Sequence, residues 1–278
     1  MGTRIWSSPR GTASVELDAK GTFLRFESDG EWLELVRTQL RLVAMLDGEI
    51  ALPLQHDTIE ESGEQNLSVL VARFEPARRR ADRVMSVPRA ASFVVQLADL
   101  VRAHHASGGE GVLGPFDPAL VVETDAGDRL VAPGMERLIQ QHDSSIRGMK
   151  GGGRIVHTRI THDQLRARDR LGVPDEVTSL AVLAIELVSG KEPYPTDSEL
   201  TYMSAVTKGQ HAPLDTLVPR LTRPLRHTLE RALSIDASAR PTLEALRSAL
   251  LEEPGVAELS RQAAPSSATI AKPWWKLW

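Results

Sequence analysis

A strongly apolar stretch between residues 177 and 188 places hydrophobic side chains on nearly every side of a helix. A helix that is apolar all round is usually a buried one. Pro174, Asp175 and Glu176 precede the stretch and suit a helix N-terminus, and Gly190 follows it as a stop signal. The pattern predicts a buried central helix in the C-terminal half of the chain.

Amphipathic helices are predicted on both sides of this central helix. Apolar residues recur at helical spacing over 92–105 and 225–233, and Arg240, Pro241 and Thr242 open a last helix. The N-terminal half shows strand patterns at 15–17 and 22–26 around a turn, a helix over 32–46, and strands at 50–54 and 67–74. The polar stretch 56–65 is expected to be a hairpin loop. A small sheet lobe should therefore precede a helical lobe.

Two motifs in the C-terminal half resemble those of eukaryotic-type Ser/Thr protein kinases as found in bacteria. The segment EVTSLAVLAIELVSGKEPY is similar to the family's D-V-Y-S-L-G to E-L-L-T-G-x-x-P-F helix, with Glu176 in place of the aspartate. The family's D-P-x-x-R-P-T turn corresponds to residues 236–242. The resemblance implies an α+β, protein-kinase-like two-lobed fold with a reduced N-terminal β lobe and a mainly helical C-terminal lobe.

The expected organisation has five parts. They are a flexible segment at 1–14, a reduced N-lobe at 15–76, a C-lobe at 77–251, a flexible linker at 252–273, and a Trp-rich tail motif at 274–278. The length of 278 residues fits one such domain. The net charge of −4 gives no basic field for nucleic acid, and the absence of cysteine excludes disulfides and thiolate metal sites. No signal peptide or spanning run is recognisable, so a cytoplasmic protein is expected.

The catalytic parts of a kinase are missing at the corresponding positions. No Gly-rich loop precedes the first strands, Arg25 replaces the strand lysine, and Gln39 (or, in another register, Glu34) stands for the helix glutamate. In the catalytic-loop segment 111–122, Phe116 falls where the aspartate is expected, and Asp117 is the only candidate base. Ala132 replaces the metal-binding aspartate. The resemblance therefore implies no phosphotransfer, no cofactor and no metal.

Residues that hold the family's fold are kept or conservatively replaced. Asp163 takes the place of the acid that pairs with the arginine of the R-P-T turn, so the resemblance predicts an Asp163–Arg240 ion pair. Glu176 is expected to be structural as well. Arg78, Arg79 and Arg80 form either a solvated connection between lobes or a site for an acidic partner. His104, His105, His157 and His162 do not have metal-site spacing and are interpreted as surface or capping residues.

The tail contains Trp274, Trp275, Leu277 and Trp278. Exposed tryptophan typically anchors an interface, so the tail is interpreted as a motif that docks into another protein. Packing on its own domain and weak contact with a membrane surface are the two alternatives. The predicted function is a catalytically inactive pseudokinase that acts as a protein-binding scaffold. The alternatives are an atypical nucleotide-binding or weakly active kinase-like enzyme and a peripheral membrane adaptor anchored by the tail.

Overall fold

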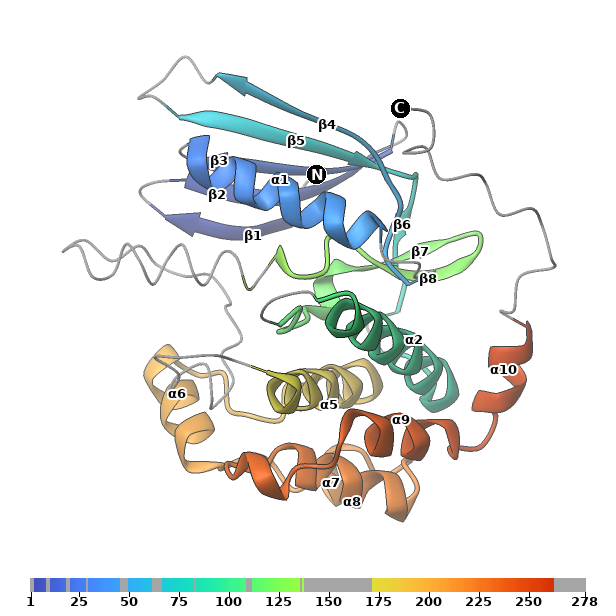
Figure 1. Ribbon diagram of the computed structural model, residues 1–278. Helices are drawn as coiled ribbons and strands as arrows, with labels where there is room; N and C mark the ends of the chain where they lie inside the picture. Colours follow the sequence, from blue (N-terminus) through green and yellow to red (C-terminus); the bar gives the residue numbers. More distant parts are fainter. Residues whose placement is uncertain are drawn as a thin grey trace.

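A sheet lobe lies beside a helical lobe in the computed structural model (Figure 1). The structure describes residues 3–8, 11–18, 21–28, 30–45, 50–61, 67–82, 84–108, 112–135, 137 and 172–262. Buried apolar residues of both lobes belong to one contiguous hydrophobic core. The two lobes are therefore joined by packing as well as by the chain.

Five antiparallel strands form the N-terminal sheet, in the order β1-β2-β3-β5-β4. They are β1 (Thr3–Ser8), β2 (Gly11–Asp18), β3 (Gly21–Ser28), β4 (Leu54–Glu61) and β5 (Ser68–Phe74). The predicted hairpin is confirmed as β2 and β3, with Asp18 opposite Gly21. The prediction of a flexible segment over 1–14 is wrong, because β1 pairs along β2 from Thr3 to Ser8. An edge strand such as β1 can form through backbone hydrogen bonds alone, so the lack of an apolar run in this segment does not prevent it from joining the sheet.

Helix α1 (Gly30–Met45) covers one face of the sheet (Figure 1). Side chains of a strand alternate between its two faces. On β3 the fully buried apolar residues are Leu24 and Phe26, and on β5 they are Leu70 and Ala72. These residues share a face because Leu24 pairs with Ala72 and Phe26 with Leu70. The apolar side of α1, which includes Leu33, Val36, Leu40 and Val43, is buried as well.

Strand β4 contains most of the stretch that was expected to be a loop. That expectation is wrong for residues 56–61, which belong to the strand. The polar pattern is misleading here because one of its carboxylates, that of Asp57, is buried. Asp57 lies on the face under α1, where its oxygens accept from Arg37 Nε at 2.5 Å and Arg41 Nε at 2.9 Å. A hydropathy pattern scores this aspartate as polar and solvent-facing, although its ion pairs let it occupy an inward position.

A second, small sheet lies at the junction of the lobes. It consists of β6 (Arg78–Arg79), β7 (Val121–Thr124) and β8 (Gly127–Leu130), in that order. The Leu52 amide donates to the Leu130 carbonyl at 2.9 Å, and the Leu130 amide donates to the Ile50 carbonyl at 2.8 Å. Residues 50–53, predicted as part of a strand, thus form only a bridge to β8, and this bridge ties the N-lobe to the C-lobe.

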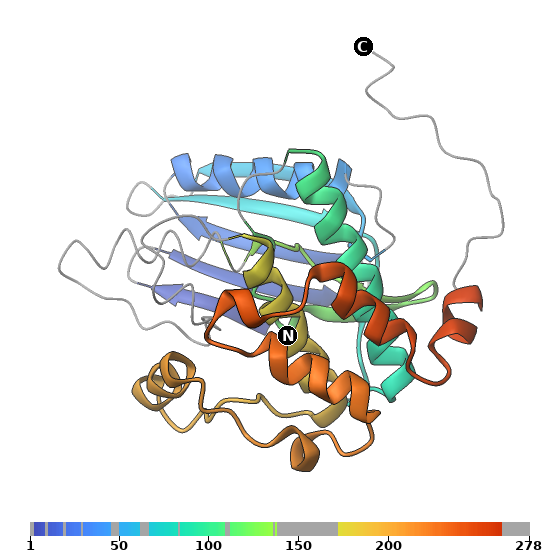
Figure 2. The same ribbon diagram turned by 60° about the horizontal axis from the view of Figure 1, so that its bottom comes forward.

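The helical lobe packs around α5 (Val173–Ser189), the predicted central helix, which is buried from Asp175 to Leu187. Figures 1 and 2 show the other helices of the lobe, which are α2 (Val87–Ala106), α6 (Glu199–Lys208), α7 (Leu214–Leu217), α8 (Arg223–Ala232), α9 (Leu243–Leu251) and α10 (Val256–Gln262). None of the helices in the described ranges has the length and apolar content needed to cross a bilayer.

Helix α10 corrects the prediction of a flexible linker that starts at residue 252. Val256 is fully buried, and the nearly buried Glu253 accepts hydrogen bonds from the backbone amide and the hydroxyl of Thr222. A segment rich in small and polar residues is therefore ordered by two specific anchors as far as Gln262. Residues 263–278, which include Trp274, Trp275, Leu277 and Trp278, lie outside the described residues.

Candidate functional site

The positions expected to carry kinase chemistry lie at the junction of the lobes. The loop 112–117, the short helix η1 (Pro118–Leu120), and the turn 131–135 after β8 form the C-lobe side. Helix α1 and the inner face of the N-terminal sheet form the other side. The contacts of each predicted site residue in this region show what its side chain does.

Glu176 fixes the loop to helix α5. Its side chain is completely buried, and its two oxygens accept from the backbone amides of Leu113 at 2.5 Å and Gly114 at 2.9 Å. The Nε2 atom of His105 lies 3.8 Å from Oε1 of the same carboxylate. A charged acceptor that serves two buried amides holds the backbone of this loop in one position.

Gly114 lies directly against α5. A Cβ atom added at this position would lie 2.6 Å from Cβ of Ser179. Contacts this short do not occur between real side chains, so the loop can approach the helix only because residue 114 is glycine. The histidine that the kinase motif has at the corresponding position has no room here.

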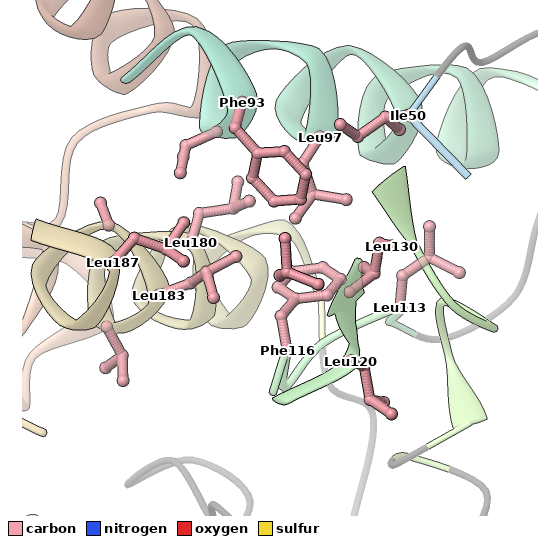
Figure 3. Packing of buried hydrophobic residues seen from close by; sticks show 14 of the residues in the cluster. Ile50, Phe93, Leu97, Leu113, Phe116, Leu120, Leu130, Leu180, Leu183 and Leu187 are labelled. Carbon is pink, nitrogen blue, oxygen red and sulfur yellow. The ribbon is translucent and has the colours of Figure 1, made fainter. Parts of the chain in front are cut away.

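The next residues of the loop are occupied with packing and capping. Phe116 is buried and points into the apolar cluster with Leu120 and Leu183 (Figure 3). Asp117 is the N-cap of η1, and its Oδ1 accepts from the Ala119 amide at 2.7 Å. The position expected for the catalytic aspartate thus holds a core phenylalanine, and the adjacent carboxylate binds the local backbone.

The turn after β8 presents a methyl group where a metal-binding turn has a carboxylate. Ala132 is buried and has a φ of 48°, in the left-handed region that residues with a Cβ seldom adopt. Gly134, with a φ of 87°, faces α1: a Cβ there would lie 2.8 Å from Nε2 of Gln39. The structure therefore brings Gln39 and this turn together.

Arg25 is not part of this arrangement. It is exposed and lies between Leu24 and Phe26, whose side chains are fully buried on the face under α1. Arg25 therefore occupies the opposite, solvent-facing side of β3. Arg25 thus does not point toward α1 as the lysine of a kinase strand does, because the inward positions on either side of it are apolar.

Arg240 ties the end of the helical lobe to the start of α5. Its guanidinium donates to the carbonyls of Ser234 at 2.9 Å and Pro174 at 3.1 Å, and its Nη1 lies 3.9 Å from Oδ1 of Asp175. Asp175 in turn accepts from the Gly172 amide at 2.8 Å. The predicted partner, Asp163, lies outside the described residues, so that ion pair remains a prediction.

A network of ion pairs at the connection between the lobes was not expected from the sequence. Arg89 Nε lies 2.6 Å from Oδ2 of Asp128, and Arg78 and Arg80 also approach carboxylates of the β7–β8 hairpin. The hydrogen bond to Asp128 raises the pKa of Arg89, whereas burial lowers the pKa of Arg80. Arg78 and Arg79 are exposed and Arg80 is half-buried, so the run is a largely solvated connection in which Arg78 and Arg80 also pair with carboxylates of the chain.

Comparison with known proteins identifies the fold. No family model matches the sequence, and neither does any curated protein. Among solved structures, the crystal structure of Rad53 1-466 in complex with AMP-PNP matches with a TM-score of 0.58 at 12% identity. Rad53 is a Ser/Thr protein kinase. The fold of this chain is kinase-like.

The similarity covers 92% of this chain and 65% of the Rad53 chain. At 12% identity it concerns the arrangement of helices and strands and leaves the chemistry to be argued from the site. Within the described residues, no three His, Asp or Glu side chains gather as a metal site requires. At the junction of the lobes, the carboxylates of Glu176 and Asp117 thus accept hydrogen bonds from backbone amides within a packed, kinase-like framework.

Proposed function

We propose that this chain is a pseudokinase, a catalytically inactive kinase-like domain that acts as a protein-binding scaffold or regulatory adaptor. The proposal rests on the side chains at two positions of the junction, the metal-binding position and the candidate base. Ala132 offers no metal ligand, and Asp117, the only acid in the described loop 112–120, caps η1. Phosphoryl transfer needs a metal ion that holds the phosphates and a base that positions the nucleophile. Neither side chain can serve in these roles as it is placed here.

The inner face of the N-terminal sheet supports the same proposal. A kinase strand presents a lysine toward the helix that carries its glutamate partner. Here the inward residues of β3 are the uncharged Thr22, Leu24, Phe26 and Ser28, and the residue of α1 at the turn is Gln39. No ion pair between strand and helix can form from these side chains, so the phosphates of a nucleotide would find no lysine at this position.

The C-terminal tail is proposed as a docking motif for a protein partner in the cytoplasm. Its tryptophans are residues that dominate binding energy at protein interfaces. A tail that follows α10 at Gln262 can act together with the kinase-like body, and two linked contacts raise affinity through effective concentration. The absence of cysteine from the chain is consistent with a reducing compartment.

Two measurements test this proposal. The melting temperature of the full-length chain should not change on addition of Mg²⁺-ATP, whereas a ligand at 100 times its Kd would add about 2.7 kcal/mol of stability. A clear ATP-dependent rise would contradict the proposal. In affinity capture, a partner retained by the full chain should be lost from a chain that ends at Lys272, and liposome binding lost on the same truncation would instead indicate a membrane anchor.

A further inference from the structure

Helix α8 carries a group of basic side chains that have no acidic partner in the described part of the chain. Its buried side consists of Leu225, Leu229 and Ala232. The opposite side presents Arg223, Arg226 and His227, and Arg220 precedes the helix. Among the described residues, none of these four basic groups forms an ion pair. We call Arg220, Arg223, Arg226 and His227 the α8 basic surface.

Other arginines of the same chain are neutralised. Arg78, Arg89 and Arg102 each lie within 3.3 Å of a carboxylate oxygen. On the α8 basic surface, four basic groups without such a pair lie close together, although the chain carries a net charge of −4. Basic side chains gathered at one place create a local positive potential that attracts acidic ligands.

The location of the charges makes them unfavourable for the helix itself. Arg223 and Arg226 lie in the first turn of α8, which contains no acidic residue. The N-terminus of a helix carries partial positive charge, so cations there destabilise it. The two arginines therefore oppose helix stability, and an external anion would remove this repulsion.

The surface includes a hollow of about 590 Å³ whose walls carry both signs of charge. Arg223, Arg226 and His227 line it together with Asp215 and Glu230. A nucleic-acid backbone would bring phosphates against these two carboxylates. A peptide can instead place acidic side chains at the arginines and neutral or basic ones opposite Asp215 and Glu230.

From this charge pattern we infer that the α8 basic surface binds an acidic peptide segment of a partner protein. The inference rests on the proposed scaffold function and names the surface of the body that would act beside the tail. Helix α8 lies on the side of the helical lobe that faces away from the sheet, so a partner can reach it without entering the junction (Figures 1 and 2).

The test is a fluorescence anisotropy titration of labelled poly-glutamate with the full-length chain. We expect saturable binding that weakens as salt rises to about 0.15 M, where the screening length is about 8 Å. The R223E/R226E variant should bind on the order of tenfold or more weakly, because two attractive charges become repulsive. The R79E/R102E variant has the same charge change on β6 and α2 and should bind like the unchanged chain.

A melting curve separates lost binding from lost folding. R223E/R226E should melt at the same temperature as the unchanged chain or higher, since it removes two cations from the positive end of α8. Absence of poly-glutamate binding, or equal weakening in both variants, would overturn the inference. Equal or tighter binding of a single-stranded DNA of matched charge would overturn it in favour of a nucleic-acid surface. If R223E/R226E still captures every partner of the unchanged chain, this inference fails while the proposed scaffold function stands.

Discussion

Replacing Glu176 by alanine should destabilise the chain more than any substitution of an exposed glutamate. The Glu176 carboxylate accepts hydrogen bonds from two buried amides, those of Leu113 at 2.5 Å and Gly114 at 2.9 Å. Truncation leaves both N–H groups buried without this acceptor, because Leu113 is fully buried and Gly114 lies directly against α5. Water cannot replace the lost acceptor without entering the core.

The expected magnitude follows from these two hydrogen bonds. A buried donor left without a partner costs about 1–3 kcal/mol, so Glu176→Ala should lower the free energy of unfolding by roughly 2–6 kcal/mol. Glu176→Gln keeps one acceptor oxygen and should cost roughly half as much. Glu176→Asp keeps the charge on a side chain one methylene shorter, and should cost less than Glu176→Ala. Glu16→Ala, at an exposed position of β2, is the control and should stay within about 0.5 kcal/mol.

Urea unfolding of the four variants measures these differences, provided that the slope of the transition stays constant. Hydrogen exchange adds a local readout, because the amides of Leu113 and Gly114 should exchange faster in Glu176→Ala. A loss below about 1 kcal/mol, with unchanged exchange at both amides, would refute the view that Glu176 holds the loop to α5.

Three further predictions concern other parts of the framework. Burial alone would raise the pKa of Asp57, but hydrogen bonds and charge from two α1 arginines outweigh it, so the pKa in the folded chain is lowered from 3.8. The Asp57 ion pairs contribute fully to the free energy of unfolding above pH 3.8, and this contribution is lost as the pH falls through the pKa of the folded chain. Asp57→Asn lacks these ion pairs, so its free energy of unfolding should depend less on pH in the acid range. An acid transition like that of the unchanged chain would contradict the prediction. Gly114→Ala should cost about 1–3 kcal/mol in urea unfolding through its clash with Ser179, and Ser179→Gly in the same chain should recover part of the loss. Burial raises the pKa of Tyr194 to about 12, so the absorbance step removed by Tyr194→Phe should lie near that pH, and a step near 10 would argue against the burial.

The central helix and the motifs around it could be predicted because their signals are local. A run apolar on every side, an acidic start and a glycine stop are all present between Pro174 and Gly190, and the structure has α5 from Val173 to Ser189. The hairpin of β2 and β3 was predictable for the same reason, since its turn and alternation lie within a dozen residues of each other.

Features set by distant partners could not be predicted in this way. Asp57 is inward-facing only because α1 supplies two arginines, and Arg25 faces solvent because its strand neighbours are the ones that α1 covers. In a strand of period two, a shift of one residue exchanges the faces completely. Helix α10 depends on the contact between Glu253 and Thr222, which are 31 residues apart in sequence.

The candidate site shows the same division. The absence of a carboxylate at Ala132 is visible in the sequence, whereas the role of Asp117 as the cap of η1 needs the backbone geometry. The α8 basic surface contains residues that look like ordinary charged positions of an amphipathic helix. Its distinguishing property is that three of its basic groups, without ion pairs to other described residues, lie around one hollow, which only the three-dimensional arrangement reveals.

We propose that this kinase-like domain does not transfer phosphate. The most direct measurement is release or transfer of the γ-phosphate of labelled Mg²⁺-ATP by the purified full-length chain and by Asp117→Asn, whose amide can still cap η1. Neither protein should release or transfer phosphate faster than the rate in buffer alone. Turnover by the unchanged chain that Asp117→Asn reduces would contradict the proposal, because the carboxylate would then act as a base.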